Sequence, residues 1–242
     1  MKSFRDLSWK SKAHVVGLYT RMNVRALFGW KALVYLAAVA VYYPTFCYIV
    51  VRTEARLTLG QALGWLVWLP STLFAVFFAM EMIARERDAG ILETFFTVSV
   101  STYRIWLTKL LTLALCVSLL AFVLVVVSCW YVVEISIPLT LVAVLPPLYF
   151  FASLSLLLSA MLKSGNAAGI IMLALLAFVA VSSEGLGATV VYPYLNPFDR
   201  PHDTDPYVWV RTVVYNKLAF TLLSGVISWR SLRWLDKRER LL

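Results

Sequence analysis

The feature that most constrains this chain is a run of 24 residues without a charged side chain, "LLTLALCVSLLAFVLVVVSCWYVV" at residues 110–133. A helix that crosses the hydrocarbon core of a bilayer needs about 20 apolar residues. Because lipid offers no hydrogen bonds, a spanning segment of this kind must satisfy its backbone internally, as a helix does. The sequence therefore predicts an all-α polytopic membrane protein in one domain over residues 1–242. We expect six spans, at about 32–51, 60–83, 110–133, 138–162, 166–183 and 212–230.

Composition supports a lipid environment and argues against nucleic acid as a partner. Hydrophobic residues make up 61% of the chain and charged residues only 14%. The net charge of +9 comes from basic residues at the ends of apolar segments, which form no DNA-reading module. His14 and His202 are isolated and the three cysteines lie inside apolar runs, so we predict no metal site.

The distribution of lysine and arginine predicts the orientation. An even number of spans places both termini on one side, and the positive-inside rule makes the more basic side cytoplasmic. All but five of the 22 basic residues fall on the side of the termini. The five exceptions are Arg52, Arg56, Arg200, Arg211 and Lys217.

Three segments outside the spans have their own character. Residues 1–31 mix cations with aromatic side chains, which is typical of a helix lying in the cytoplasmic interface. Residues 184–211 form a long external segment that begins with apolar residues, so part of it is expected to re-enter the membrane surface. Glu81 and Lys217, near the ends of two spans, are expected to extend to the nearby interface. Gly60 and Gly64 form a GxxxG pattern, which permits close helix packing but is equally expected by chance.

Motifs for catalysis are absent from the sequence. No GxxxxGK[ST] phosphate loop, HExxH or GxSxG occurs, so the chain is expected to bind no ATP through such a loop and to be no enzyme.

Residues 84–109, including "RERDAGILETFFTVSVSTYRIWLTK", combine charges with apolar clusters between two predicted spans. Gly90 can supply a turn after the preceding helix. Beyond it lie Leu92, Phe95 and Phe96, and then a second cluster around Trp106. Apolar side chains on a cytoplasmic loop need a cover, and spacing alone fits lipid and another protein equally well.

This segment resembles the loop between spans two and three of ABC-2 type transporter permeases, whose pattern is E-x-x-x-G-T-L-E-x-L-L-x-x-P-[VI]-S and a final G-K. The chain departs from the pattern at Ile91 and Ser99, which stand where the family has threonine and proline. The residues that match in register are Glu86, Gly90, Leu92, Glu93, Phe95, Phe96, Ser101 and Lys109. The resemblance extends to "YLNPFD" at 194–199, to Asn216 and Lys217, and to the basic tail "DKRER".

The resemblance implies a half-transporter of the type V exporter fold in a bacterial or archaeal plasma membrane. Two permease chains, identical or related, would combine with two cytoplasmic ABC ATPase subunits that hold ATP and Mg²⁺. Residues 84–109 would be the coupling segment that seats in an ATPase groove, and the turn with Lys163 and Ser164 would be a second contact. Residues 184–211 would correspond to short re-entrant helices. The predicted coupling residues are Glu86, Arg87, Gly90, Leu92, Glu93, Phe95, Phe96, Lys163 and Ser164.

Two other function classes fit the sequence less well. A mechanotransmission subunit would need a larger external domain than residues 184–211 provide. A channel or secondary transporter would be expected to carry charges or broken helices at mid-membrane, which the sequence lacks.

The sequence does not specify the transported substrate. The lack of intramembrane charge favours an amphipathic or lipid-like molecule over a bare metal ion. One group of aromatic residues could line a hydrophobic substrate path or form an aromatic belt at the outer interface. These are Tyr42, Tyr43, Phe46, Trp65 and Trp68.

Overall fold

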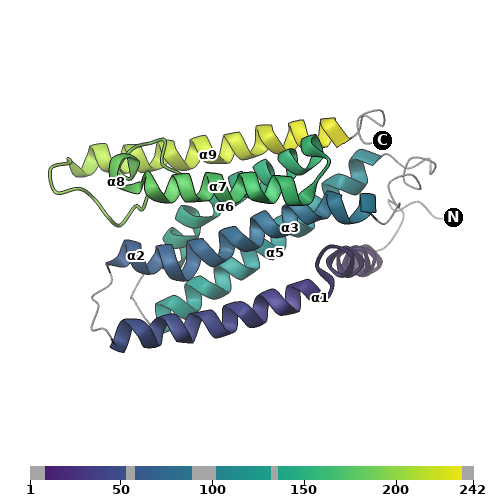
Figure 1. Cartoon of the computed structure of the whole chain (residues 1–242), viewed down its shortest axis with the longest axis horizontal. Coiled ribbons are helices and arrows are strands. Elements are labelled where there is room, and N and C mark those ends of the chain that lie inside the picture. Colours follow the sequence, from purple (N-terminus) through teal and green to yellow (C-terminus); the bar gives the residue numbers. More distant parts are fainter. Residues whose placement is uncertain (1–8, 53–57, 89–101, 132–135, 236–242) are drawn as a thin grey trace.

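The computed structural model describes residues 9–52, 58–88, 102–131 and 136–235, which are helical over most of their length and contain no strand. Its elements are bundled along one long axis (Figure 1). The elements are α1 (Trp9–Arg52), α2 (Leu59–Leu63), the π-helix η2 (Gly64–Trp68), α3 (Leu69–Asp88), α5 (Thr102–Tyr131), α6 (Ile137–Leu162), α7 (Gly165–Val181), α8 (Ser183–Leu186) and α9 (Pro206–Leu235).

Within the described residues, four helices are long and apolar enough to cross a membrane, and they confirm four of the predicted segments. These helices cover Gly29–Val50, Leu59–Glu86, Ile105–Trp130 and Ile137–Leu162. The other two predicted spans fall on α7, an apolar helix of 17 residues, and on α9, which has 30 residues. The all-α prediction is therefore confirmed for the described residues, and the number of six spans stays a prediction.

Helix α1 changes direction at Gly29, whose φ of 51° and ψ of −147° are not helical. A positive φ strains any residue with a side chain, so glycine suits this break. Figure 1 shows the part of α1 before Gly29 nearly end-on, while the part after it follows the long axis of the bundle. This kink lies two residues before residue 31, the predicted end of the interfacial first helix.

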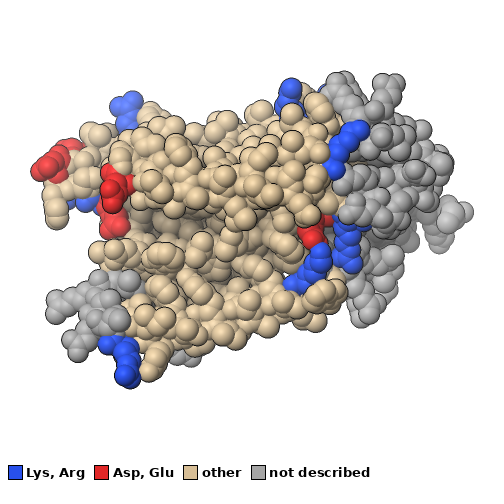
Figure 2. Space-filling view, in the orientation of Figure 1, with Lys and Arg blue, Asp and Glu red and all other residues tan. Residues whose placement is uncertain are grey.

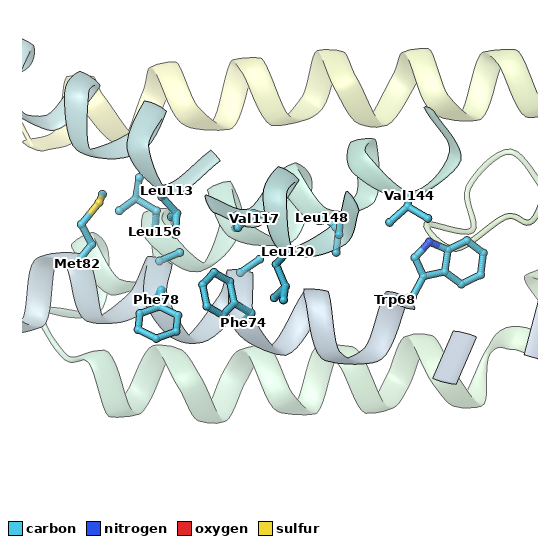
Figure 3. Packing of buried hydrophobic residues seen from close by; sticks show 14 of the residues in the cluster. Trp68, Phe74, Phe78, Met82, Leu113, Val117, Leu120, Val144, Leu148 and Leu156 are labelled. Atoms are coloured by element: carbon cyan, nitrogen blue, oxygen red, sulfur yellow. The ribbon is translucent and has the colours of Figure 1, made fainter. Parts of the chain in front are cut away.

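The core lies where α3, α5 and α6 meet. Trp68 of η2 and Phe74, Phe78 and Met82 of α3 share one cluster of buried apolar side chains with partners from the other two helices (Figure 3). Those partners are Leu113, Val117, Leu120, Val144, Leu148 and Leu156. Helix α6 also packs against α7 and α9, so it is the central helix of the bundle.

Polar side chains hold α6 against α3. Ser155 donates a hydrogen bond to the carbonyl of Val76 at 2.9 Å, and Ser159 donates one to Met80 at 2.8 Å. Small hydroxyl side chains allow two helix backbones to approach closely, and in an apolar medium each needs such a partner. Serines spaced four apart on α6 therefore fix the register of the two helices.

The two ends of the bundle differ in the elements that they hold. The proximal end is where α3 ends, α5 begins and α6 turns into α7, and the distal end holds α2, α8 and the segment before α9. The first part of α1 and the last turns of α9 also lie at the proximal end (Figure 1).

Candidate functional site

The turn between α6 and α7 carries the second predicted contact, Lys163 and Ser164. Lys163 ends α6 in the left-handed conformation, with φ 52° and ψ 26°. Ser164 caps α7, because its hydroxyl accepts a hydrogen bond from the backbone N–H of Ala167 at 3.2 Å. A Cβ added to Gly165 would lie 2.9 Å from the Cβ of Ala84, so the turn is packed closely against α3. This turn is therefore a tightly held feature of the proximal end.

Glu86 and Lys109, which match the ends of the family pattern, form an ion pair between α3 and α5. Their side chains are only 14% and 5% exposed. The Lys109 ammonium also lies 4.8 Å from the ring centroid of Trp106, which is fully buried. The sequence aligned Glu86 and Lys109 with the family pattern, but it did not predict that their side chains form an ion pair.

The remaining predicted coupling residues are not placed. Gly90, Leu92, Glu93, Phe95 and Phe96 lie outside the described residues. Arg87 belongs to the last turn of α3, and its side chain is also outside the description. Their assignment stays a prediction.

The structure separates the five aromatic residues of the predicted substrate path. Tyr42, Phe46 and Trp65 form one cluster, with ring centroids 5.9 Å apart for the first two and 6.1 Å for Phe46 and Trp65. Tyr43 faces the other way, is 9% exposed, and its hydroxyl is hydrogen-bonded to that of Ser128 at 2.8 Å.

Trp68, the fifth, lies 5.4 Å from the ring of Tyr194 and is 6% exposed. The side chains of Trp65 and Trp68 both line one cavity at the distal end.

The π-helix η2 explains why Tyr42 contacts the second helix. In η2 the N–H of Leu69 bonds to the carbonyl of Gly64, one residue further back than in an α-helix. Pro70 has no N–H to offer the carbonyl of Trp65. That carbonyl accepts a hydrogen bond from the Tyr42 hydroxyl instead, at 3.0 Å. Pro70 and Tyr42 together thus account for the π-helical turn η2 at the wall of the distal cavity.

Two cavities follow α3 along one face of the molecule. The distal cavity has a volume of about 640 Å³ and the second, toward the proximal end, about 500 Å³. Leu73 lines both. From Gln61 in the first to Met80 in the second, the helical rise amounts to about 30 Å, close to the thickness of a bilayer core. Figure 2 shows this face hollowed between α1 and α7.

The ends of this groove differ in charge. At the proximal end Lys31 lines the second cavity and forms an ion pair with Glu81 of α3. At the distal end Asp199 lines the first cavity. Figure 2 shows further acidic side chains at that end. Between them the described lining is mainly apolar.

The segment from 187 to 205 is held on the bundle by buried polar groups of α9. Asn216 donates two hydrogen bonds, to the carbonyls of Val190 at 2.6 Å and Tyr192 at 2.8 Å. Lys217 donates to the carbonyl of Leu195 at 2.8 Å. Within the described residues, α8 is the one helix between α7 and α9, and turns follow it up to Pro206.

Lys217 corrects one sequence-based expectation. It was expected to extend to the interface, yet it is only 7% exposed and its ammonium is bound to Leu195. Lys217 can be buried because the 187–205 segment covers its side chain and supplies a carbonyl oxygen that accepts a hydrogen bond from its ammonium.

Replacing Asn216 with leucine is expected to lower the free energy of unfolding by about 1–3 kcal/mol, because two buried carbonyls lose their donor while the volume is kept. Thermal unfolding of the purified protein measures the loss. Tyr215→Phe, on the exposed neighbour, should change it by less than about 0.5 kcal/mol. Equal effects at the two positions would show that Asn216 does not hold the segment.

The helices, the apolar surface and the polar clusters at both ends define an integral membrane protein with a groove along one face. A family model described as "ABC-2 family transporter protein" matches residues 33–210. Neither the curated proteins nor the solved structures contain a match to the chain. The chain belongs to the ABC-2 transporter family, so it is an ABC transporter permease, a membrane transport subunit and not a catalytic domain.

Proposed function

We propose that this permease is the membrane-spanning subunit of an ATP-driven exporter. Two permease chains, identical or related, combine with two cytoplasmic ATPase subunits. The ATPase subunits bind ATP and Mg²⁺, and the permease itself binds neither. Hydrolysis on the ATPases drives a movement of the permease helices that carries the cargo outward.

The proposal rests mainly on the contacts that join α3 to α5 and to the α6–α7 turn at the proximal end, in a chain of this family. The ion pair of Glu86 and Lys109 joins the two helices that flank residues 89–101, and the Lys163–Ser164 turn is packed on α3 through Gly165. A partner that pushed on either place would act on the same helix, α3. Helix α3 also forms the floor of the groove, so a displacement there would reach the cavity walls.

The proposal includes six spans with both termini in the cytoplasm. Helix α7 rises about 26 Å and α9 about 45 Å, so α9 is long enough to cross and α7 nearly so. The proximal end collects the first part of α1, the last turns of α9 and the turn with Lys163. Its high content of lysine and arginine favours the cytoplasmic side.

A second permease chain is expected to face the groove. The groove is open on one side, between α1 and α7, and its mainly apolar walls would be exposed to lipid in a single chain. Two copies meeting across this face would enclose a path about as long as the membrane is thick. Cargo would then move from the Lys31 end toward the Asp199 end.

Purification of the tagged chain from its native membrane tests the proposal. We expect an ATPase chain with a GxxxxGK[ST] loop to co-purify, and ATP hydrolysis to require that partner. The isolated permease, freed of other proteins as checked by mass spectrometry, should bind no nucleotide. Hydrolysis by the isolated permease, or the steady absence of any ATPase, would contradict the proposal.

A further inference from the structure

The distal cavity combines aromatic walls with a single charged residue. Trp65 and Trp68 come from η2, while Tyr192 and Tyr194 come from the segment before α9. Among the described residues that line the cavity, Asp199 is the only acidic or basic one. Burial raises the pKa of both tyrosine hydroxyls above its usual value, so these groups stay neutral. The cavity is thus apolar and aromatic with one negative group.

The position of Asp199 depends on Gly60. A Cβ added to Gly60 would lie 1.9 Å from Oδ2 of Asp199, so only glycine leaves room for the carboxylate there. The same oxygen accepts a hydrogen bond from the Asn196 amide at 3.2 Å. Asp199 itself is exposed, and it is one of the residues that line the cavity. The fold therefore places a carboxylate at the edge of an aromatic cavity.

This chemistry selects for positive charge on an apolar body. The faces of tryptophan and tyrosine rings attract cations, and the attraction grows where water is excluded. A carboxylate adds a direct charge partner and repels anions. A volume of about 640 Å³ is in the range of sites for small organic molecules.

We propose that the distal cavity binds organic cations with apolar substituents, and that such cations are cargo of the transporter. The cation lies against the aromatic side chains with its charge toward Asp199, and its apolar groups extend along the groove toward Leu73. The assignment as cargo rests on the proposed function. The binding itself requires only this chain.

Equilibrium binding of tetraphenylphosphonium to the full-length permease in nanodiscs of uncharged lipid tests the proposal. Tetraphenylborate, of similar shape but opposite charge, is the matched ligand. We expect the cation to bind saturably and the anion not to bind. Asp199→Asn keeps the size and the hydrogen bond to Asn196, and should weaken cation binding about tenfold. Asp203→Asn removes the same charge outside the cavity lining and should leave binding unchanged.

A charge-relocation variant separates an electrostatic role from a structural one. Gln61 lines the cavity and forms a capping box with Thr58, which glutamate also supports. Adding Gln61→Glu to Asp199→Asn should therefore restore most of the cation affinity. Trp65→Leu should weaken binding several-fold, whereas Trp229→Leu, remote from the cavity, should not.

Three results would overturn the inference. These are equal binding of the cation and the anion, an unchanged affinity in Asp199→Asn, and loss of binding only when the permease is driven into dimers, which would mean that a second copy occupies the groove. None of them bears on whether an ATPase co-purifies. Failure of this inference is therefore distinguishable from failure of the proposed function.

Discussion

Lys109→Met is expected to lower the free energy of unfolding by about 3–5 kcal/mol. The substitution leaves the carboxylate of Glu86 at a largely buried position without the ammonium, and breaking a buried pair from one side costs this much. Glu86→Gln should have a similar effect, since Lys109 then keeps its charge above the buried Trp106. Thermal unfolding of each variant in detergent measures both losses.

The double variant Glu86→Gln/Lys109→Met should recover much of the loss, because no uncompensated charge remains. Lys31→Met offers a control within the same bundle. Its pair with Glu81 is 41% and 19% exposed, so its loss should cost at most about 1 kcal/mol. If Lys109→Met were no more destabilising than Lys31→Met, the Glu86–Lys109 pair would not be what joins α3 to α5.

The spans were the most predictable part of the fold, because length and apolar content are local properties of the sequence. The predicted 138–162 differs by one residue at its start from the helix Ile137–Leu162. The predicted 60–83 ends earlier than Leu59–Glu86, since α3 continues past Ile83 into charged residues. Charged residues mark the end of an apolar run in the sequence, whereas a helix ends where its backbone hydrogen bonds end.

Contacts between distant segments could not be predicted from the sequence. Gly60 and Gly64 suggested a helix-packing pattern, yet Gly60 lies against Asp199 of a loop, and a Cβ added to Gly64 would meet nothing within 4 Å. Tyr42 and Tyr43 were treated alike, although neighbours on a helix point to different sides and only Tyr42 joins the aromatic cluster. The one sequence feature that pointed to the buried ion pair was that the family pattern has an acidic residue at Glu86 and a basic residue at Lys109.

Phe95→Asp is expected to abolish association with the ATPase while the permease still inserts into the membrane. Phe95 lies outside the described residues, and its role follows from the resemblance of residues 84–109 to the family pattern. If Leu92, Phe95 and Phe96 fill an apolar groove of the ATPase, a carboxylate there is buried without a partner. Such burial costs several kcal/mol at an interface, and about 1.4 kcal/mol already lowers affinity tenfold. Gly90→Val should weaken association less, by disturbing the turn that the sequence predicts before the apolar cluster.

Co-purification of the ATPase with Phe95→Asp and with Thr97→Asp decides whether this segment is the coupling element. Both variants add one negative charge to the same segment, but Thr97 is not among the predicted contacts, so its variant should retain the ATPase. Membrane content measured by immunoblot controls for insertion. If residues 84–109 only rest on lipid, both aspartates would instead weaken membrane association of the segment and leave the bound ATPase at wild-type amounts. Retention of the ATPase by Phe95→Asp would therefore assign its docking to another part of the chain, with the Lys163–Ser164 turn as the next position to test.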